Sequence, residues 1–243
     1  MTEVHAYRVL RHLACSSLES HEVIVWADPR GEERAKMLKR SFWDRYAGVY
    51  DLVTRPGNKE LAEASAWIAD FLRPRDRLLD AACGTGTFAC LLAPVVEFVL
   101  ACDYSEKMLE QARRKAARRG LRNIAFRVRD LRSLTLPRQV FDAAVCANVL
   151  HLLDSPEDAV AQLKRVVRPG GLIIVANYVH ETGADSGRME LISRFGFEFA
   201  QDWDAAALEE FLSEQGLRII DKSLFDAWQP LEVVVCRADD DVV

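Results

Sequence analysis

Apolar residues in the middle of this chain occur in short continuous runs, separated by stretches with helical periodicity. The runs at residues 78–82, 98–102, 141–147 and 172–176 are mostly apolar, a pattern typical of strands buried on both faces of a parallel sheet. Residues 124–129 instead alternate between apolar and polar side chains, which indicates a strand at the sheet edge. The alternation of strands and helices predicts an α/β fold with a doubly wound sheet, helices on both faces and the third strand outermost.

The segment after the fourth predicted strand has clear helix signals. Ser155 and Pro156 are typical of an N-cap and a first helical residue, so we predict a helix over residues 156–167. Pro169-Gly-Gly171 follows, and we expect it to end the helix and separate it from the strand at residues 172–176.

The last third of the chain contains two apolar runs, residues 217–225 and 231–236, separated by residues 226–230. A parallel connection needs about a dozen residues or more, so two strands this close in sequence can pair only in antiparallel fashion. This ending argues against an all-parallel nicotinamide-binding domain.

A glycine-bearing turn follows the first predicted strand. Gly84 and Gly86 allow the backbone to turn tightly and to approach a ligand, and the following helix presents free N–H groups there. Asp103 ends the next strand 19 residues after Gly84, about the separation at which an acid meets a ribose diol. Together with Ala89, however, the turn also satisfies a relaxed nicotinamide-cofactor fingerprint, so the turn alone does not exclude a dehydrogenase.

Four segments of the chain resemble the class I S-adenosylmethionine-dependent methyltransferases. Asp80-Ala-Ala-Cys-Gly-Thr-Gly86 is similar to motif I, with Ala82 in place of the usual first glycine. Asp103-Tyr-Ser-Glu-Lys-Met108 resembles the segment that follows in that family, and Asn148-Val-Leu-His151 resembles motif IV. A helix, then Arg-Pro-Gly-Gly171, then a buried strand is also similar to the family. The resemblance is to its small-molecule branch, the methyltransferase type 11 or ubiquinone-biosynthesis-like proteins.

The resemblance covers roughly residues 41–237 and implies a seven-stranded sheet of order 3-2-1-4-5-7-6 in which strand 7 is antiparallel. It also implies S-adenosylmethionine as cofactor, with S-adenosylhomocysteine as product. The positions that match cofactor-binding positions of the family are Tyr50, Asp80, Ala82, Gly84, Gly86, Asp103, Tyr104, Met108, Asp130, Leu131 and Asn148.

Some of these residues have simpler alternative roles. The aromatic stretch at residues 41–54 resembles the N-terminal helix that folds over the cofactor, with Tyr46 and Tyr50 near the methionine end. Aromatic residues also pack ordinary helices onto sheets, however. Asp130 and Leu131 match the family's adenine-binding position, but an aspartate here can equally cap the turn that follows.

The resemblance implies methyl transfer to a small molecule through an oxygen or nitrogen nucleophile. His151 follows the fourth strand and is the candidate general base, with a structural role in its loop as the alternative. Aromatic residues within residues 177–203 favour an apolar or aromatic acceptor. Two other functions stay open: a nicotinamide-dependent oxidoreductase, and a non-catalytic protein that binds S-adenosylmethionine.

Composition limits the remaining possibilities. The 243 residues suit one α/β domain, and the formal charge of −5 argues against nucleic acid as the main partner. Basic residues at 113–122 are predicted to form a solvated helix face. The six cysteines form no C-x-x-C pair and no histidine spacing indicates a metal, so we expect free thiols, a cytoplasmic location and no metal.

No apolar run is long enough to span a membrane, so we expect no membrane partner, and the protein to act as a monomer or homodimer. We expect residues 1–36 to form an extension of uncertain order and residues 37–243 to form one domain. Its predicted parts are a helical cap (37–73), a cofactor-binding core (74–180), and a substrate-covering segment with the C-terminal strands (181–237).

Overall fold

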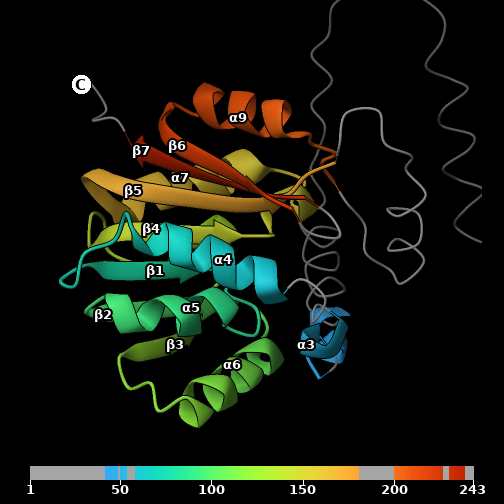
Figure 1. Ribbon diagram of the computed structural model, residues 1–243, viewed down its shortest axis with the longest axis vertical. Helices are drawn as coiled ribbons and strands as arrows, with labels where there is room; N and C mark the ends of the chain where they lie inside the picture. Colours follow the sequence, from blue (N-terminus) through green and yellow to red (C-terminus); the bar gives the residue numbers. More distant parts are fainter. Residues whose placement is uncertain (1–41, 49, 54–57, 181–199, 227–229, 239–243) are drawn as a thin grey trace, which may run out of the picture. The chain divides into compact units, whose positions relative to one another are not determined.

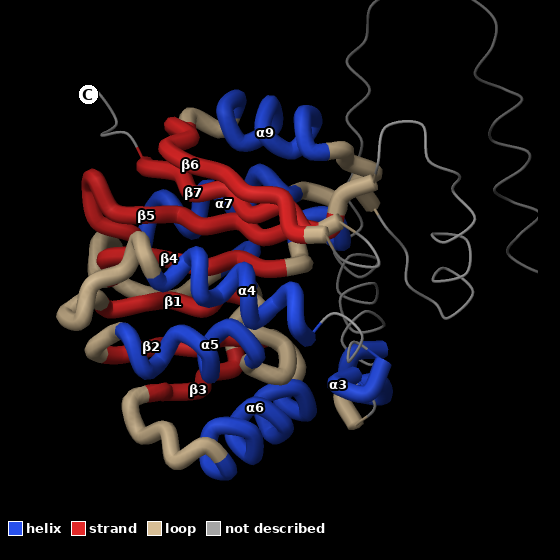
Figure 2. The backbone as a smooth tube through the Cα atoms, viewed as in Figure 1, coloured by secondary structure: helices blue, strands red, loops and turns tan. Residues whose placement is uncertain are grey.

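The computed structural model describes residues 42–48, 50–53, 58–180, 200–226 and 230–238, and its centre is a seven-stranded sheet (Figures 1 and 2). The strand order is β3-β2-β1-β4-β5-β7-β6. The first five strands are parallel, and β7 is antiparallel to both β5 and β6. This confirms the predicted order, the antiparallel strand 7 and the outermost place of the third strand. The strands are β1 (Arg77–Ala81), β2 (Phe98–Asp103), β3 (Ile124–Val128), β4 (Phe141–Ala147), β5 (Val167–Tyr178), β6 (Leu217–Phe225) and β7 (Leu231–Ala238).

Helices cover both faces of the sheet, as predicted (Figure 1). Apolar residues of α4 and α5 share one buried cluster with the sheet, whereas those of α7 and α9 share a second cluster on the other face. Helix α6 packs beside α5 and against β2 and β3. The helices are α3 (Tyr50–Val53), α4 (Asn58–Ala69), α5 (Thr87–Leu92), α6 (Glu106–Arg118), α7 (Pro156–Val166) and α9 (Ala205–Glu214). Short 3-10 helices are η2 (Ala93–Val95), η3 (Leu131–Ser133) and η4 (Leu150–Leu152).

The boundary between α7 and β5 differs from the prediction. Helix α7 ends at Val166, and β5 begins at once at Val167, before the Pro-Gly-Gly segment. The pairing with β4 shifts register between Phe141 and Ala143, so that the segment folds out of the ladder as an irregularity. A Cβ at Gly171 would lie 2.7 Å from the carbonyl oxygen of Asp142. The glycine is therefore needed for close backbone contact inside the strand, and it does not separate helix from strand.

The parallel register brings the loops after β1, β2 and β4 together. Ala81 at the end of β1 pairs with Cys102 of β2 and with Cys146 of β4. Ligands of open α/β sheets bind outside the carboxyl ends of the strands, where the strand order reverses. The reversal here lies between β1 and β4, so the loop after β1 is central to any such site.

Candidate cofactor-binding site

The loop between β1 and α5 has an unusual backbone. Ala82, Gly84 and Gly86 have φ values of 58°, 53° and 74°, all in the left-handed region. A Cβ at Gly86 would approach the Cβ of Ala112 to 2.8 Å, so this glycine allows α5 to pack against α6. A Cβ at Gly84 would meet no atom within 4 Å, so the space beside this residue is open to a ligand. Ala82 occupies a conformation that costs a non-glycine residue about 1–2 kcal/mol, so a glycine would fit this position without strain.

Asp103 fixes this loop to the end of β2. Its Oδ2 accepts a hydrogen bond from the Gly84 N–H at 2.9 Å, and its Oδ1 accepts one from the Ser105 N–H at 2.8 Å. The residue is 5% exposed, and burial raises the pKa of its carboxyl group to about 6, against the opposing effect of these hydrogen bonds. Each carboxylate oxygen has a further lone pair. Asp103 is therefore able to accept hydrogen bonds from a diol beside the open face of Gly84.

Asp80 lies beneath the loop. It is 2% exposed, and its Oδ2 accepts a hydrogen bond from the Ala89 N–H in the first turn of α5 at 2.8 Å. Burial raises the pKa of this carboxyl group to about 7. The structure thus shows Asp80 supporting the loop from the protein interior, and direct contact with a cofactor stays a prediction.

Asp130, which matches the family's adenine-binding position, follows the end of β3, and the predicted cofactor residue Tyr104 follows the end of β2. Asp130 accepts hydrogen bonds from the Arg132 N–H and Nε at 3.0 Å on Oδ1, and from its Nη2 at 2.7 Å on Oδ2. Asp130 and Arg132 both influence the pKa of the Tyr104 phenol, which burial raises strongly. The capping role considered for Asp130 is therefore present, and its contact with adenine stays a prediction.

Two further predicted cofactor residues are buried in the protein interior. Leu131 is 5% exposed and belongs to the cluster between the sheet and α7. Met108 is 2% exposed in the first turn of α6, where its N–H donates to the Ser105 Oγ at 3.2 Å. Their side chains contribute to packing around the site, and their contacts with a cofactor stay predictions.

The aromatic segment before α4 reaches the same region. Burial raises the pKa of the Tyr50 phenol, and the nearby Tyr178 and Asp103 add to the shift. The rings of Tyr50 and Trp43 are 6.1 Å apart. Tyr50 thus lies close enough to Asp103 and Tyr178 to interact with both, at the end of the sheet that carries the loop.

Asn148 and His151 follow β4 but differ in their surroundings. Asn148 has a φ of 53°, and its Oδ1 accepts a hydrogen bond from the Tyr178 N–H at 3.1 Å. His151 is 6% exposed, and its Nδ1 lies 2.7 Å from the Asn177 Oδ1. Because Asn177 Nδ2 donates to the Tyr178 carbonyl at 3.0 Å, its Oδ1 faces the imidazole and favours a proton on Nδ1. Burial lowers the pKa of His151, so the ring is neutral near pH 7 with the lone pair on Nε2.

The prediction of a solvated helix face is wrong for one of its basic residues. Lys115 belongs to the basic stretch that we expected to be a solvated helix face, but its side chain is only 14% exposed and forms an ion pair with Asp51. The ammonium also bonds Thr85 in the glycine loop. Lys115 lies one helical turn after Ala112, at the border between the buried and the exposed faces of α6, so helical periodicity alone does not indicate its contacts.

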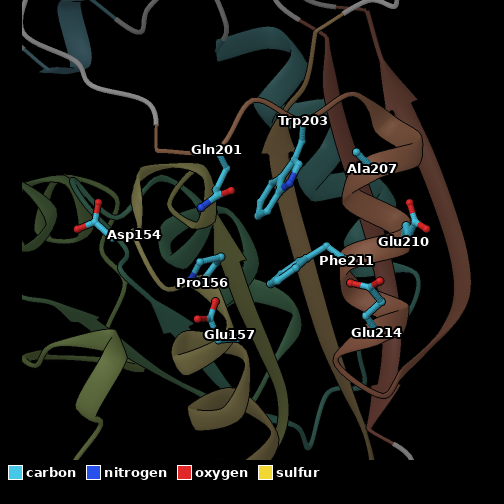
Figure 3. A pocket seen from close by; sticks show the side chains of 9 residues that line it. All are labelled: Asp154, Pro156, Glu157, Gln201, Trp203, Ala207, Glu210, Phe211 and Glu214. Atoms are coloured by element: carbon cyan, nitrogen blue, oxygen red, sulfur yellow. The ribbon is translucent and has the colours of Figure 1, made fainter. Parts of the chain in front are cut away.

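A separate pocket of about 430 Å³ lies between the start of α7 and α9 (Figure 3). Trp203 and Phe211 stack in it, with ring centroids 4.9 Å apart. No predicted cofactor residue lines it; its lining residues are Asp154, Pro156, Glu157, Gln201, Trp203, Ala207, Glu210, Phe211 and Glu214. Acidic side chains stand beside the two rings in its wall, so it gives no clear support to an apolar acceptor. The other aromatic residues behind that prediction, in residues 189–199, lie outside the described residues.

Two kinds of site are absent from the part of the chain that the structure describes. No group of three or more histidine, cysteine, aspartate or glutamate side chains there is arranged to hold a metal ion. Among the same residues, no helix has both the length and the apolar character needed to cross a membrane.

Comparison with known proteins identifies relatives of the central part of the chain. Residues 79–175 match the family of methyltransferase domains. Demethylmenaquinone methyltransferase of Clavibacter sepedonicus is 31% identical over 141 residues, which are 57% of this chain and 57% of that protein. A ubiquinone/menaquinone biosynthesis C-methyltransferase of Coxiella burnetii is 32% identical over 153 residues, covering 56% of this chain and 61% of that protein.

The match therefore spans about three fifths of the length of these relatives. Among solved structures, magnesium protoporphyrin IX methyltransferase from Synechocystis PCC 6803, crystallised with bound S-adenosylhomocysteine, superposes with a TM-score of 0.60. It is 21% identical, and the match covers 74% of this chain and 83% of that one. This likeness establishes a shared fold.

Proposed function

We propose that this chain, whose residues 79–175 match the family of methyltransferase domains, is a class I S-adenosylmethionine-dependent methyltransferase that acts on a small molecule. The observation that carries the proposal is the arrangement at the end of β1 and β2. Asp103 holds the N–H of Gly84 at 2.9 Å while the space beside Gly84 is open. This combination suits a ribose that approaches the loop closely and donates its hydroxyl groups to the carboxylate.

The residues present fit a nucleoside with a polar tail. Asp103 has lone pairs for a diol, and Tyr104 and Asp130 lie near one another where a base would extend from the ribose. Tyr50, from the N-terminal segment, lies close enough to Asp103 for the carboxylate to raise the pKa of its phenol. We propose that these residues bind S-adenosylmethionine, and that Ala82, Gly84 and Gly86 shape the loop around it.

S-adenosylmethionine, when bound, supplies a methyl group on a positively charged sulfur. The chain's own contribution would be to position the acceptor and to exclude water, because holding two reactants in line can supply much of the catalysis in such reactions. Tyr50 and Tyr178 are buried enough to raise their pKa values, that of Tyr178 to about 12. Both phenols therefore stay protonated at neutral pH and can donate hydrogen bonds to an acceptor.

The two named relatives favour a ring-bearing acceptor. Their names concern demethylmenaquinone and the biosynthesis of ubiquinone and menaquinone, the latter as a C-methyltransferase. We propose a small aromatic acceptor that is methylated on oxygen or nitrogen, and carbon methylation is the outcome that these relatives would favour instead. Incubation with methyl-labelled S-adenosylmethionine and a panel of hydroquinones, phenols and amines, followed by NMR of the product, identifies the atom. Absence of labelled product with every class would contradict a catalytic role.

Replacing His151 with alanine tests the proposed base. If Nε2 accepts the acceptor's proton, turnover should fall by about 10²-fold while the affinity for S-adenosylhomocysteine stays within twofold of the original. His180→Ala is the matched control, since the partly exposed His180 imidazole lies 3.5 Å from the exposed Asp202 and its replacement should leave turnover unchanged. Equal rates for His151→Ala and the original protein would show that the buried histidine only supports its loop.

Further aspects of the proposal concern partners and location. We propose a cytoplasmic protein that works as a monomer or homodimer, without nucleic acid or membrane as a partner. The net charge of −5 supports the absence of nucleic-acid and membrane partners, because an acidic protein is repelled by phosphate backbones and anionic lipid surfaces.

A further inference from the structure

Lys115 reaches from α6 to the glycine loop and to the N-terminal segment at once. Its Nζ donates to the Asp51 Oδ1 at 3.0 Å, to the Thr85 Oγ1 at 3.1 Å and to the Thr87 Oγ1 at 3.1 Å. These are three acceptors for the three N–H bonds of one ammonium group. Thr85 and Thr87 flank Gly86, so Lys115 contacts both sides of the sharpest part of the loop.

The same contacts join α3 to the loop. Thr85 is 1% exposed, and its Oγ1 donates to the Asp51 Oδ1 at 2.5 Å while it accepts from Lys115. Asp51 is the neighbour of Tyr50 in α3. Because Asp51 is 46% exposed, solvent weakens its ion pair with Lys115. The buried threonine hydroxyl and the 14% exposed lysine side chain give the cluster its fixed geometry.

A second contact joins the N-terminal segment to the turn after β2. The Ser105 Oγ donates to the Asp44 Oδ1 at 2.5 Å, and the Ser105 N–H binds Asp103 at 2.8 Å. The N-terminal segment is therefore attached to both loops that carry the proposed cofactor residues, through Asp51 at the loop after β1 and through Asp44 at the turn after β2.

We propose that Lys115 is a positioning residue for cofactor binding, and that it acts by fastening α3, through Asp51 and Thr85, onto the glycine loop. The fastening holds Tyr50 beside Asp103 and fixes the loop backbone on either side of Gly86. This inference rests on the proposed function, because the ligand that benefits is S-adenosylmethionine. Lys115 itself touches neither ligand nor reacting atoms in this account.

The experiment measures ligand affinity and backbone exchange in the same set of variants. Lys115→Met keeps the length of the side chain and removes the ammonium, and Asp51→Asn removes the partner charge at a half-exposed position that does not threaten folding. Arg114→Met is the matched control: Arg114 is exposed on the same helix. The structure shows no hydrogen bond or ion pair for Arg114 with any other described residue. Titration calorimetry with S-adenosylhomocysteine gives the affinity, and hydrogen–deuterium exchange of α3 reports its docking.

Each of the two cluster variants should weaken S-adenosylhomocysteine binding about tenfold, as expected for loss of a charge-assisted hydrogen bond. The double variant should be little worse than either single one, since both changes open the same contact. Exchange of α3 should increase in the ligand-free Lys115→Met protein and stay unchanged in Arg114→Met. A purely structural role of Lys115 would lower the melting temperature without changing affinity in the protein that remains folded.

Two outcomes separate this inference from the proposed function. If the original protein binds S-adenosylhomocysteine and Lys115→Met binds it equally well, with unchanged exchange of α3, the positioning role is wrong and the function stands. If the original protein does not bind S-adenosylhomocysteine, both the proposed function and the role of Lys115 in cofactor binding are wrong. The exchange of α3 in the ligand-free proteins then still shows whether Lys115 fastens this helix.

Discussion

Replacing Asp103 with alanine should weaken the binding of S-adenosylhomocysteine by about 10- to 100-fold, which corresponds to about 1.5–3 kcal/mol for hydrogen bonds to a charged group. The carboxylate accepts one backbone N–H from each of the two loops, Gly84 and Ser105. Its loss removes the acceptor for the ribose and also frees the glycine loop. Calorimetric titration at pH 7.5, above the pKa of about 6, measures the effect with the carboxylate ionised.

Asp142→Ala is the matched control for this change. Asp142 also accepts a backbone hydrogen bond, from the Arg77 N–H at 2.8 Å, but it lies at the amino ends of β1 and β4. Both variants lose a carboxylate that supports the backbone, whereas only Asp103 is placed to meet the ligand. Equal affinities of the Asp103→Ala variant and the original protein would remove Asp103 from the proposed ribose site.

Replacing Asp80 with asparagine should stabilise the protein at high pH and leave it unchanged at low pH. Burial raises the pKa of Asp80 from 3.8 to about 7, so its ionised form is disfavoured in the folded state. Its contribution to the free energy of unfolding is therefore fully present below pH 3.8 and falls as the pH rises to about 7. The total loss is roughly 4 kcal/mol, at about 1.36 kcal/mol for each pKa unit.

Asparagine keeps the shape and an oxygen that can accept the Ala89 N–H, which now binds Asp80 at 2.8 Å. Denaturant unfolding at pH 5 and pH 8.5 gives the two free energies for each protein. The stabilisation of the variant over the original protein should be greater at pH 8.5 than at pH 5 by roughly 2–3 kcal/mol, because at pH 5 only part of the loss has occurred. Asp76→Asn serves as control, because Asp76 accepts the Arg73 N–H in a turn before the amino end of β1, the strand that also carries Asp80. A stability difference between Asp80→Asn and the original protein that does not vary with pH would mean that Asp80 does not titrate as described.

The edge place of the third strand and the antiparallel pair at the end could be predicted from the residues themselves, whereas the full strand order was implied by the family resemblance. The alternating run at residues 124–129 identified the edge strand β3, and the short connection before β7 required an antiparallel pair. The path of Pro169-Gly-Gly171 could not be predicted in the same way. Whether a glycine ends a helix or permits close contact inside a strand depends on the partner strand, here the carbonyl of Asp142.

The site was predictable where spacing along the chain determines it, and less so where side chains meet across the fold. The separation of Gly84 and Asp103 matched a contact that the structure contains, a 2.9 Å hydrogen bond. The role of Lys115 depends on Asp51, which is 64 residues away in sequence, and helical periodicity alone placed it on a solvated face. The contact between His151 and Asn177 is of the same kind, because it joins the end of β4 to the end of β5.

Calorimetric titration of the purified protein with S-adenosylmethionine, S-adenosylhomocysteine and NAD in parallel tests the central claim most directly. The glycine turn, taken alone, satisfies a nicotinamide fingerprint as well, so the three ligands distinguish the two readings of the same residues. We expect S-adenosylmethionine and S-adenosylhomocysteine to bind at one site and NAD not to bind. Binding of NAD alone would contradict the account and would assign Gly84, Gly86 and Asp103 to a dehydrogenase.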